Sequence, residues 1–371
     1  MTIWIISCLA VCALSVLLCG VVIPQILLIA FRRRLFDEPD ERKIHKSLVP
    51  RLGGIAFAPV IMFSIVLLMG VGMVADSITF SEFGEEGASL CFGFCAVMMV
   101  YLLGMADDLI GVRYRAKFMI QIICGVMFIV GGVWLNDLHG LLFINALPDW
   151  LGWGLTVLAV VYVVNAVNLI DGIDGLASGL SGIACLYYGL TFFMAGEYVY
   201  AIVSFATLGV LIPFFYYNVF GNPDKQKKIF MGDTGSLTIG VILCFLGLNI
   251  ADGEIMPIDG ANPFVLAFAP LIVPCFDVVR VYLHRVRNGR NPFLPDKNHI
   301  HHKLLAAGMP QRMAMISIIS LSLALTLGNV CLSSVLNINV LVVFDILVWT
   351  VANILLSRYI SRRSGGAGDE A

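Results

Sequence analysis

The stretch NAVNLIDGIDGL, residues 165–176, places four polar side chains at the end of a strongly apolar segment. Asn165, Asn168, Asp171 and Asp174 follow one another at three-residue intervals. On a helix each would be turned about 60° from the last, so the first three would share a face. Polar groups in a membrane segment are costly and usually functional, and Asn and Asp oxygens are ligands that Mg²⁺ accepts. The alternative is a helix end where these side chains cap backbone groups.

Apolar residues dominate the rest of the chain. Of its 371 residues, 59% are hydrophobic and 13% are charged, whereas soluble domains carry roughly 25% charged residues. Apolar runs of about 18 residues or more, enough to cross a bilayer, recur along almost the whole length. We therefore predict an all-α polytopic membrane protein with one domain over residues 1–360 and a disordered cytoplasmic tail over residues 361–371. The 10 scattered cysteines are expected to be packing residues, because no CxxC or Cys/His metal spacing is present.

The positions of the charges predict the topology. The connections between apolar runs alternate between basic ones and ones that hold only acidic charges. All 23 Lys and Arg residues fall in five clusters, at 32–51, 113–117, 225–228, 280–312 and 358–363. By the positive-inside rule these clusters are cytoplasmic, which gives about eleven transmembrane helices, the N-terminus outside and the C-terminus cytoplasmic. The first run is expected to be retained as a helix rather than cleaved. The predicted helices cover residues 3–31, 52–74, 89–106, 115–135, 150–168, 176–195, 198–218, 234–250, 262–283, 312–332 and 338–358.

Further charged groups fall at cytoplasmic helix ends. Asp107 and Asp108 are adjacent, and two such carboxylates need a cation, a proton or a basic neighbour such as Lys117. Their alternative role is to cap a helix end. Asp233 lies in a Gly-rich turn that leads into a helix. Its carboxylate could bind a metal there, and the free N–H groups of the turn could bind an anion. The alternative is that Asp233 belongs to an N-cap of the helix. Basic residues of the first cytoplasmic loop could bind phosphate or lipid headgroups: His45, Lys46 and Arg51.

Three histidines lie close together in the longest basic connection. His299, His301 and His302 are accompanied by several Lys and Arg residues and by no Cys, so an anion-binding cluster fits better than a closed zinc site. In the helix before them, Asp277 and Arg280 are spaced to form an i, i+3 ion pair, and we expect this pair to be structural.

These motifs occur in a fixed order on one predicted membrane face. They are Asp107-Asp108, NxxNxxDGxDGL at 165–176, FMGDTGSL at 230–237 and HIHH at 299–302. Together they resemble the polyprenyl-phosphate N-acetylhexosamine-1-phosphate transferases, and the likeness runs from the first predicted helix to the tenth. Within that family the chain looks most like the bacterial branch that acts on undecaprenyl phosphate and N-acetylglucosamine (GlcNAc). HIHH differs from the three consecutive histidines of the phospho-N-acetylmuramoyl-pentapeptide branch.

The resemblance implies a set of binding residues. Asn168 and Asp233 look like the Mg²⁺ ligands, with Mn²⁺ as an alternative ion. Phe230 resembles the aromatic residue that stacks on uracil, and Lys117 the lysine that reaches toward phosphate. The histidines resemble a cluster near the nucleotide phosphates and sugar: His299, His301 and His302.

The resemblance also implies catalytic carboxylates. Asp107 and Asp108 resemble the acidic pair implicated in catalysis, and Asp171 matches a motif carboxylate whose role, catalytic or structural, stays open. Asn165 is placed with the substrate contacts, and Asp174 is taken as structural.

The activity that the family implies is transfer of GlcNAc 1-phosphate from UDP-GlcNAc to undecaprenyl phosphate, with release of UMP. It would be the first membrane step of an O-antigen-like surface polysaccharide, on the cytoplasmic face of the plasma (inner) membrane. The expected partners are the UDP-N-acetylhexosamine, undecaprenyl phosphate and membrane lipids, with no nucleic acid; a homodimer stays open, as do one-step and aspartyl-phosphate routes. The alternatives are another UDP-N-acetylhexosamine or UDP-MurNAc-pentapeptide as donor or, in a different class, a secondary transporter. Transporters keep polar groups near the midplane and often show inverted repeats.

Overall fold

The computed structural model describes residues 1–35, 49–75, 87–253, 255, 260–289 and 298–366. His45 and Lys46 therefore lie outside the described residues. Glu85 and Asp259, which belong to the acidic connections predicted to lie outside the membrane, do so as well.

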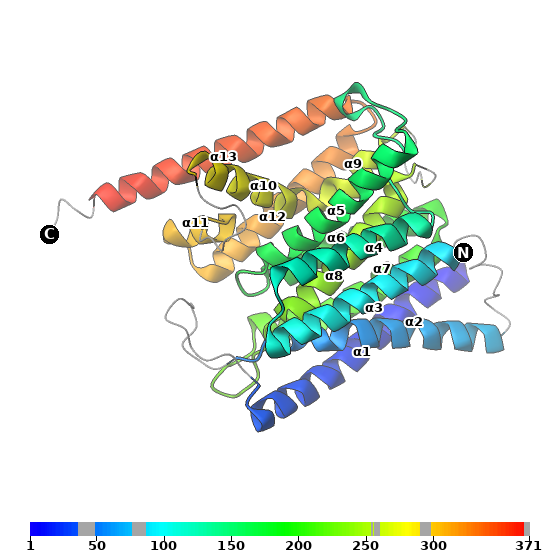
Figure 1. The fold of residues 1–371 in the computed structure, drawn as a ribbon. Helices are drawn as coiled ribbons and strands as arrows, with labels where there is room; N and C mark the ends of the chain where they lie inside the picture. The colour runs from blue at the N-terminus through cyan, green and yellow to red at the C-terminus, as the bar shows by residue number, and fades with distance from the viewer. Residues whose placement is uncertain (36–48, 76–86, 254, 256–259, 290–297, 367–371) are drawn as a thin grey trace.

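The described chain is built from helices, and most of them run side by side in one bundle (Figure 1). Within the described ranges, β-structure is limited to one isolated antiparallel bridge between Asp137 and Ala146. In order, the elements are α1 (Thr2–Arg33), η1 (Gly53–Ala56), α2 (Phe57–Val74), α3 (Gly87–Ile110), α4 (Tyr114–Val130), η3 (Leu141–Phe143), α5 (Asp149–Ile170), α6 (Leu176–Ala195), α7 (Tyr198–Val219), α8 (Gly232–Ala251), α9 (Pro263–Phe268), η4 (Ala269–Leu271), α10 (Ile272–Arg287), α11 (Ile300–Ala306), α12 (Gln311–Leu332) and α13 (Ile338–Gly366).

Ten helices of the described chain are long and apolar enough to cross a membrane. A further helix, α4, occupies the place of the predicted segment 115–135 but has 17 residues, because Gly131 and Gly132 end it early. At 1.5 Å per residue it is about 25 Å long, near the lower limit for a span. The polytopic membrane architecture is thus confirmed, and the count of eleven spans stays a prediction.

Two further predicted segments differ clearly from the observed helices. The predicted helix 262–283 is divided into α9, the 3₁₀ turn η4 and α10. Pro270 and Pro274 account for the interruption, because neither has an N–H group to donate to the preceding turn. Helix α13 continues to Gly366 and so includes residues 361–366, where the tail was predicted to begin.

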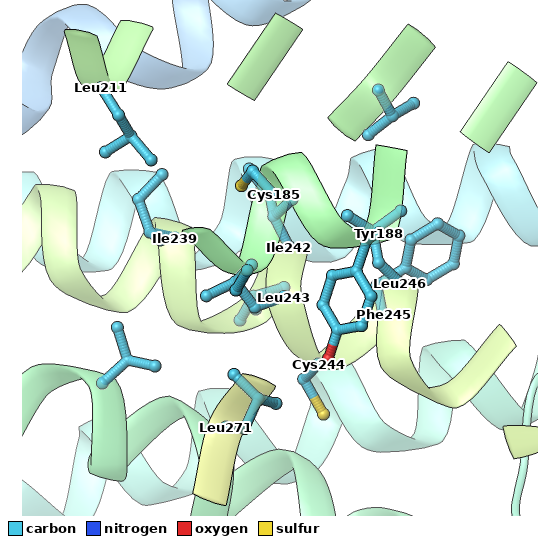
Figure 2. Packing of buried hydrophobic residues seen from close by; sticks show 14 of the residues in the cluster. Cys185, Tyr188, Leu211, Ile239, Ile242, Leu243, Cys244, Phe245, Leu246 and Leu271 are labelled. Carbon is cyan, nitrogen blue, oxygen red and sulfur yellow. The ribbon is translucent and has the colours of Figure 1, made fainter. Parts of the chain in front are cut away.

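Helix α8 is the centre of the bundle. Every residue from Thr234 to Ala251 is buried, so the helix meets protein on all sides. Figure 2 shows Tyr188 of α6 lying beside Phe245 and Leu246 of α8. The Tyr188 hydroxyl donates a hydrogen bond to the Ala267 carbonyl at 2.6 Å, which ties α6 to α9 across this core. All ten cysteines are free, and five of them are buried in the apolar interior, as the sequence predicted.

The ends of several helices meet at one end of the bundle. The C-terminal ends of α3, α5 and α7 and the N-terminal ends of α4, α6 and α8 lie there, next to η1 and α11. The N-terminus of the chain lies at the opposite end from the C-terminal end of α13 (Figure 1). This arrangement brings the polar motifs together, because they occupy those helix ends.

Candidate active site

The turn that begins α8 is held by a segment from the first loop. The Phe230 N–H donates to the Pro50 carbonyl at 2.8 Å, and the Gly53 and Gly54 N–H groups donate to the carbonyls of Phe230 and Met231, each at 2.9 Å. These three backbone hydrogen bonds hold the FMGD turn against the start of η1. They also bring the backbone of Arg51, a candidate from the first loop, next to Gly232 at the edge of the site.

Glycines allow backbone to touch backbone around this turn. A Cβ atom on Gly54 would lie 2.0 Å from the Gly235 nitrogen, and one on Gly104 would lie 2.5 Å from the Thr234 α-carbon. Neither distance is compatible with a side chain, because real Cβ contacts are longer than 3.0 Å. Helix α3 and the 50–54 segment therefore press directly on the first turn of α8.

Asp108 caps the N-terminus of α8 from another helix. Its Oδ1 accepts the Asp233 N–H at 2.8 Å, and its Oδ2 accepts the Thr234 N–H at 2.8 Å and the Thr234 hydroxyl at 2.5 Å. These are N–H groups that a helix cannot satisfy internally, and the helix dipole favours a carboxylate there. In the structure Asp108 therefore sets the position of Asp233.

Lys117 joins Asp107, one member of the acidic pair, to Asp233 in the first turn of α8. Its ammonium lies 2.5 Å from Oδ2 of Asp233 and also forms an ion pair with Oδ2 of Asp107. The other oxygen of Asp107 accepts the Val112 N–H at 2.6 Å. All three ionised side chains are at most about a third exposed, so their charges interact more strongly than on an open surface. The structure thus brings Asp107, Lys117 and Asp233 together as one cluster.

Asn168 reaches the same carboxylate from α5. Its Nδ2 lies 3.1 Å from Oδ1 of Asp233 and donates to the Ser236 hydroxyl at 2.8 Å. Asn165, one turn earlier, is directed to α4 instead, where its Nδ2 donates to Oε1 of Gln121 at 2.7 Å. The structure therefore places Asn168 in the cluster and gives Asn165 an interhelical hydrogen bond.

The loop after α5 carries Asp171 and Asp174. Asp171 caps the end of α5, and burial and then the carboxylate of Asp233 raise its pKa to about 7. Asp174 forms an ion pair with Lys228 at 2.5 Å, which agrees with the structural role predicted for it. Asn218 holds this loop: its Oδ1 accepts the Gly175 N–H at 2.6 Å.

A cleft of about 490 Å³ opens beside this loop. It is lined by Asp174 and Lys228, by the end of α7 and by the start of α12. The Lys228 ammonium lies 5.9 Å from the centre of the Phe230 ring, so the predicted stacking aromatic is next to the cleft. Residues from the end of α7 and the start of α12 complete the lining: Val219, Phe220, Gly221, Asn222, Pro223, Asp224, Gln311 and Arg312.

The histidines lie at the start of α11. The His299 and His301 rings are nearly parallel with centres 5.8 Å apart, and the His301 and His302 ring centres are 4.2 Å apart. His301 is 1% exposed, neither of its ring nitrogens has a hydrogen-bond partner among the described residues, and it lies against Gly172. Burial, followed by the charges of the neighbouring His302 and His299, lowers the pKa of His301 to about 3. His301 is therefore neutral at pH 7, and His302 is the more exposed of the two.

The donor set near Asp233 suits a hard cation. No group of three or more His, Cys, Asp or Glu side chains within the described ranges is arranged to hold a metal. Asp233 and the amide of Asn168 are nevertheless adjacent, and turning that amide would direct its oxygen to the same point as the carboxylate. The position beside Asp233 already takes a positive charge, that of Lys117. The residues present therefore fit Mg²⁺ by type and position.

Comparisons with known proteins identify the family of the chain. Residues 90–251 match the family model described as glycosyl transferase family 4. The chain is 31% identical over 304 residues to the undecaprenyl-phosphate alpha-N-acetylglucosaminyl 1-phosphate transferase of Yersinia pestis, which covers 80% of the chain and 76% of that relative. It is 32% identical over 298 residues to the protein of the same name from Escherichia coli (strain K12), covering 78% and 74%. It is 29% identical over 322 residues to a probable undecaprenyl-phosphate N-acetylglucosaminyl 1-phosphate transferase of Bacillus subtilis (strain 168), covering 86% and 83%.

A helical membrane bundle with this site, and with these relatives, defines a phosphoglycosyltransferase. The chain belongs to glycosyl transferase family 4, as a member of the polyprenyl-phosphate N-acetylhexosamine-1-phosphate transferases. The alternative class, a secondary transporter, is set aside on this ground.

The sequence did not single out several residues and contacts that shape the site. Thr234 and Ser236 bind Asp108 and Asn168, and Asn218 holds the Asp174 loop. Thr234 and Ser236 could have been found, since both lie within the GDTGS motif. Asn218 carries no local signal, because its partners are distant in sequence. Asp277 was predicted only as the partner of Arg280, and its contact with His299 was missed for the same reason.

Proposed function

We propose that this protein transfers GlcNAc 1-phosphate from UDP-GlcNAc to undecaprenyl phosphate and releases UMP. The observation that carries the proposal is the Asp107–Lys117–Asp233 cluster with Asn168 on the second oxygen of Asp233. It lies at an end of the membrane bundle, where a soluble nucleotide sugar can meet the phosphate of a membrane lipid. The names of the relatives support undecaprenyl phosphate as the acceptor and N-acetylglucosaminyl 1-phosphate as the group transferred, and we propose UDP as the carrier of that group. We place the site on the cytoplasmic face of the plasma (inner) membrane, at the first membrane step of a surface polysaccharide.

The reaction is a phosphoryl transfer between two oxygen atoms. An oxygen of the lipid phosphate bonds to the β-phosphorus of UDP-GlcNAc, the bond from that phosphorus to the bridging oxygen breaks, and UMP leaves with the bridging oxygen. The bond from the sugar to its phosphate is kept. A phosphate monoester has a second pKa of about 6, so the lipid phosphate is already mostly a dianion at neutral pH. The protein must therefore position two anions and offset their charge.

Asp233 and Asn168 would hold Mg²⁺, which neutralises charge on the diphosphate when it is bound. Lys117 is the fixed cation of the site, and a phosphate that enters beside Asp107 would share its hydrogen bonds. Asp108 keeps Asp233 in place by capping α8. We assign Asp107 to orienting Lys117 and the incoming phosphate, and we keep Asp171 as a carboxylate of the site beside Asp233.

The cleft beside Phe230 is the proposed site for the nucleoside part of the donor. Phe230 offers a ring for a base, and the Lys228 ammonium beside that ring offers hydrogen-bond donors. Aromatic stacking combined with a few fixed polar groups is a common way to recognise a base.

The decisive test is release of UMP by the purified protein in detergent with undecaprenyl phosphate. UDP-GlcNAc, UDP-GalNAc and UDP-MurNAc-pentapeptide are offered in parallel, with and without Mg²⁺ and with Mn²⁺ as replacement. We expect UMP and a pyrophosphate-linked lipid with UDP-GlcNAc and a divalent ion. Preference for another donor would change the substrate, and release that needs no lipid acceptor would overturn the proposal.

A further inference from the structure

Asp277 is fully buried in α10, and both of its carboxylate oxygens are used. Oδ1 accepts the Arg280 guanidinium at 2.8 Å and the Ile300 N–H at 3.0 Å. Oδ2 lies 2.8 Å from Nδ1 of His299, which is itself 5% exposed. The sequence predicted the Asp277–Arg280 pair, and the structure adds a second partner 22 residues further on.

The pair also fixes the backbone that leads into the histidine helix. Arg280 donates to the Asn298 carbonyl, so residues 298, 299 and 300 are all held by Asp277 or by its partner. Ile300 begins α11, and its N–H has no acceptor inside that helix. The Asp277 carboxylate thus sets where α11 begins, and α11 brings His301 against Gly172 of the 165–176 motif.

An ionised carboxylate only accepts hydrogen bonds, and the Arg280 and Ile300 donors favour the ionised form of Asp277. The proton of the His299 ring is then on Nδ1, and Nε2 is the nitrogen that remains for other contacts. A carboxylate on the far side of an imidazole fixes its tautomer and orientation in this way.

We propose that Asp277 is a positioning residue that holds His299 with its Nε2 directed to the phosphate groups handled by the site. This inference rests on the proposed function, in which those groups belong to the nucleotide sugar and to the lipid acceptor. Asp277 itself touches neither substrate.

The substitution Asp277→Asn separates positioning from a merely structural role. Asparagine has nearly the same shape, and its oxygen can still accept from Arg280 and Ile300. Its NH₂ group would instead face Nδ1 of His299, which would have to accept, so the ring proton would move to Nε2. We expect a loss of at least tenfold in kcat/KM with the unfolding temperature nearly unchanged. A rise in KM for UDP-GlcNAc alone would assign the contact to the donor, and a rise for the lipid alone to the acceptor.

Two comparisons complete the experiment. In an Asp277→Asn, His299→Ala double variant, the loss should be no larger than in His299→Ala alone, because both changes remove one interaction. Asp345→Asn is the matched control: Asp345 is 3% exposed in α13 and accepts from Asn329 at 2.9 Å, but it lies away from the site. We expect Asp345→Asn to keep wild-type kinetics. Wild-type kinetics in Asp277→Asn, or additive losses in the double variant, would overturn the inference.

Failure of the proposed function is recognised separately. If the wild-type protein releases no UMP with any UDP-sugar, the function proposal fails. The contact between Asp277 and His299 is then tested by measuring the unfolding temperature. The destabilisations of Asp277→Ala and His299→Ala should be less than additive in the double variant. Full additivity would show that the two residues do not act together.

Discussion

The imidazole of His301 lies directly against the α-carbon of Gly172, so that a Cβ atom added there would be 2.1 Å from Nε2. This contact joins α11 to the loop that follows Asn168 and Asp171. The first Gly of the DGIDG sequence is therefore required for packing, since any larger side chain would collide with His301. The histidine cluster and the 165–176 motif are therefore in direct contact at this point.

Gly172→Ala should destabilise the protein and lower UMP release, because the methyl group can be placed only by moving α11 or the loop. Overpacking of this kind costs about 1 to 3 kcal/mol. Thermal unfolding in detergent measures the effect, and Gly154→Ala is the control, since no atom lies within 4 Å of a Cβ there. In a Gly172→Ala, His301→Ala protein the first change should add little to the second; equal destabilisation in both backgrounds would place the strain elsewhere.

Lys117→Met should reduce UMP release by about a hundredfold, since a fixed cation that stabilises transferring phosphate contributes on that order. Methionine keeps most of the stem but leaves Asp107 and Asp233 without their shared counter-charge. Arg115→Met, on the exposed side of the same helix, is the control and should retain the wild-type rate. Similar rates for the two variants would remove Lys117 from the site.

Asp233→Asn should abolish activity and the response to Mg²⁺ or Mn²⁺, because the carboxylate is the charged ligand of the proposed metal site. Mn²⁺ binding followed by electron paramagnetic resonance gives a readout independent of turnover. Asp149→Asn, an exposed carboxylate at the opposite end of α5 from Asn168, should change neither. Unaltered Mn²⁺ binding by Asp233→Asn would assign the ion to other ligands.

Acid should destabilise the folded protein partly through His301. The pKa of His301 falls from 6.5 to about 3 on folding. Between these two pH values, His301 is protonated in the unfolded chain and neutral in the folded protein. The stability that this site contributes is complete above pH 6.5 and is lost as the pH falls toward 3, at about 1.4 kcal/mol per pH unit. His301→Asn should therefore flatten the fall of unfolding temperature between pH 6.5 and 5. The exposed His284→Asn should leave that slope as it is; an unchanged slope in His301→Asn would contradict the assignment.

The predicted orientation can be tested at two exposed positions. A Cys at Asp149 should react with a membrane-impermeant maleimide added outside intact cells, and a Cys at Lys227 should react only after the membrane is opened. Reactivity is measured as the increase over the parent chain, which has 10 cysteines of its own. Outside labelling at Lys227 would reverse the topology and move the site to the other face.

Much of the site could be predicted because it depends on which helix ends share a membrane face. Asn168 and Asp233 are 65 residues apart, yet both were expected at cytoplasmic helix ends, and their side chains lie 3.1 Å apart. The metal-binding role proposed for them stays a prediction. The breaks in helix 262–283 were also signalled locally, by Pro270 and Pro274.

The remaining contacts depend on which helices are neighbours, and spacing along one chain segment does not fix that. Asn165 shares the three-residue spacing of Asn168, but its amide finds Gln121 because α4 packs on that side of α5. Asp277 was assigned to its i, i+3 partner Arg280, and this contact exists at 2.8 Å. A carboxylate has a second oxygen, however, and only the tertiary fold decides that His299 binds it.

The glycine contacts around the first turn of α8 divide the site into a fixed half and an adjustable half. Gly54 and Gly104 leave no space between their backbones and residues 234–235, so Asp233 has almost no freedom to shift when substrates arrive. Helix α11 has seven residues and joins the site through side chains. We therefore expect any movement on substrate binding to occur in α11 rather than in the Asp233 turn. We expect few substitutions in the Asp233 turn to be tolerated, so resistance to an inhibitor that binds there should be rare. Substitutions in α11 should be tolerated more often, so resistance to an inhibitor that depends on α11 should arise more easily.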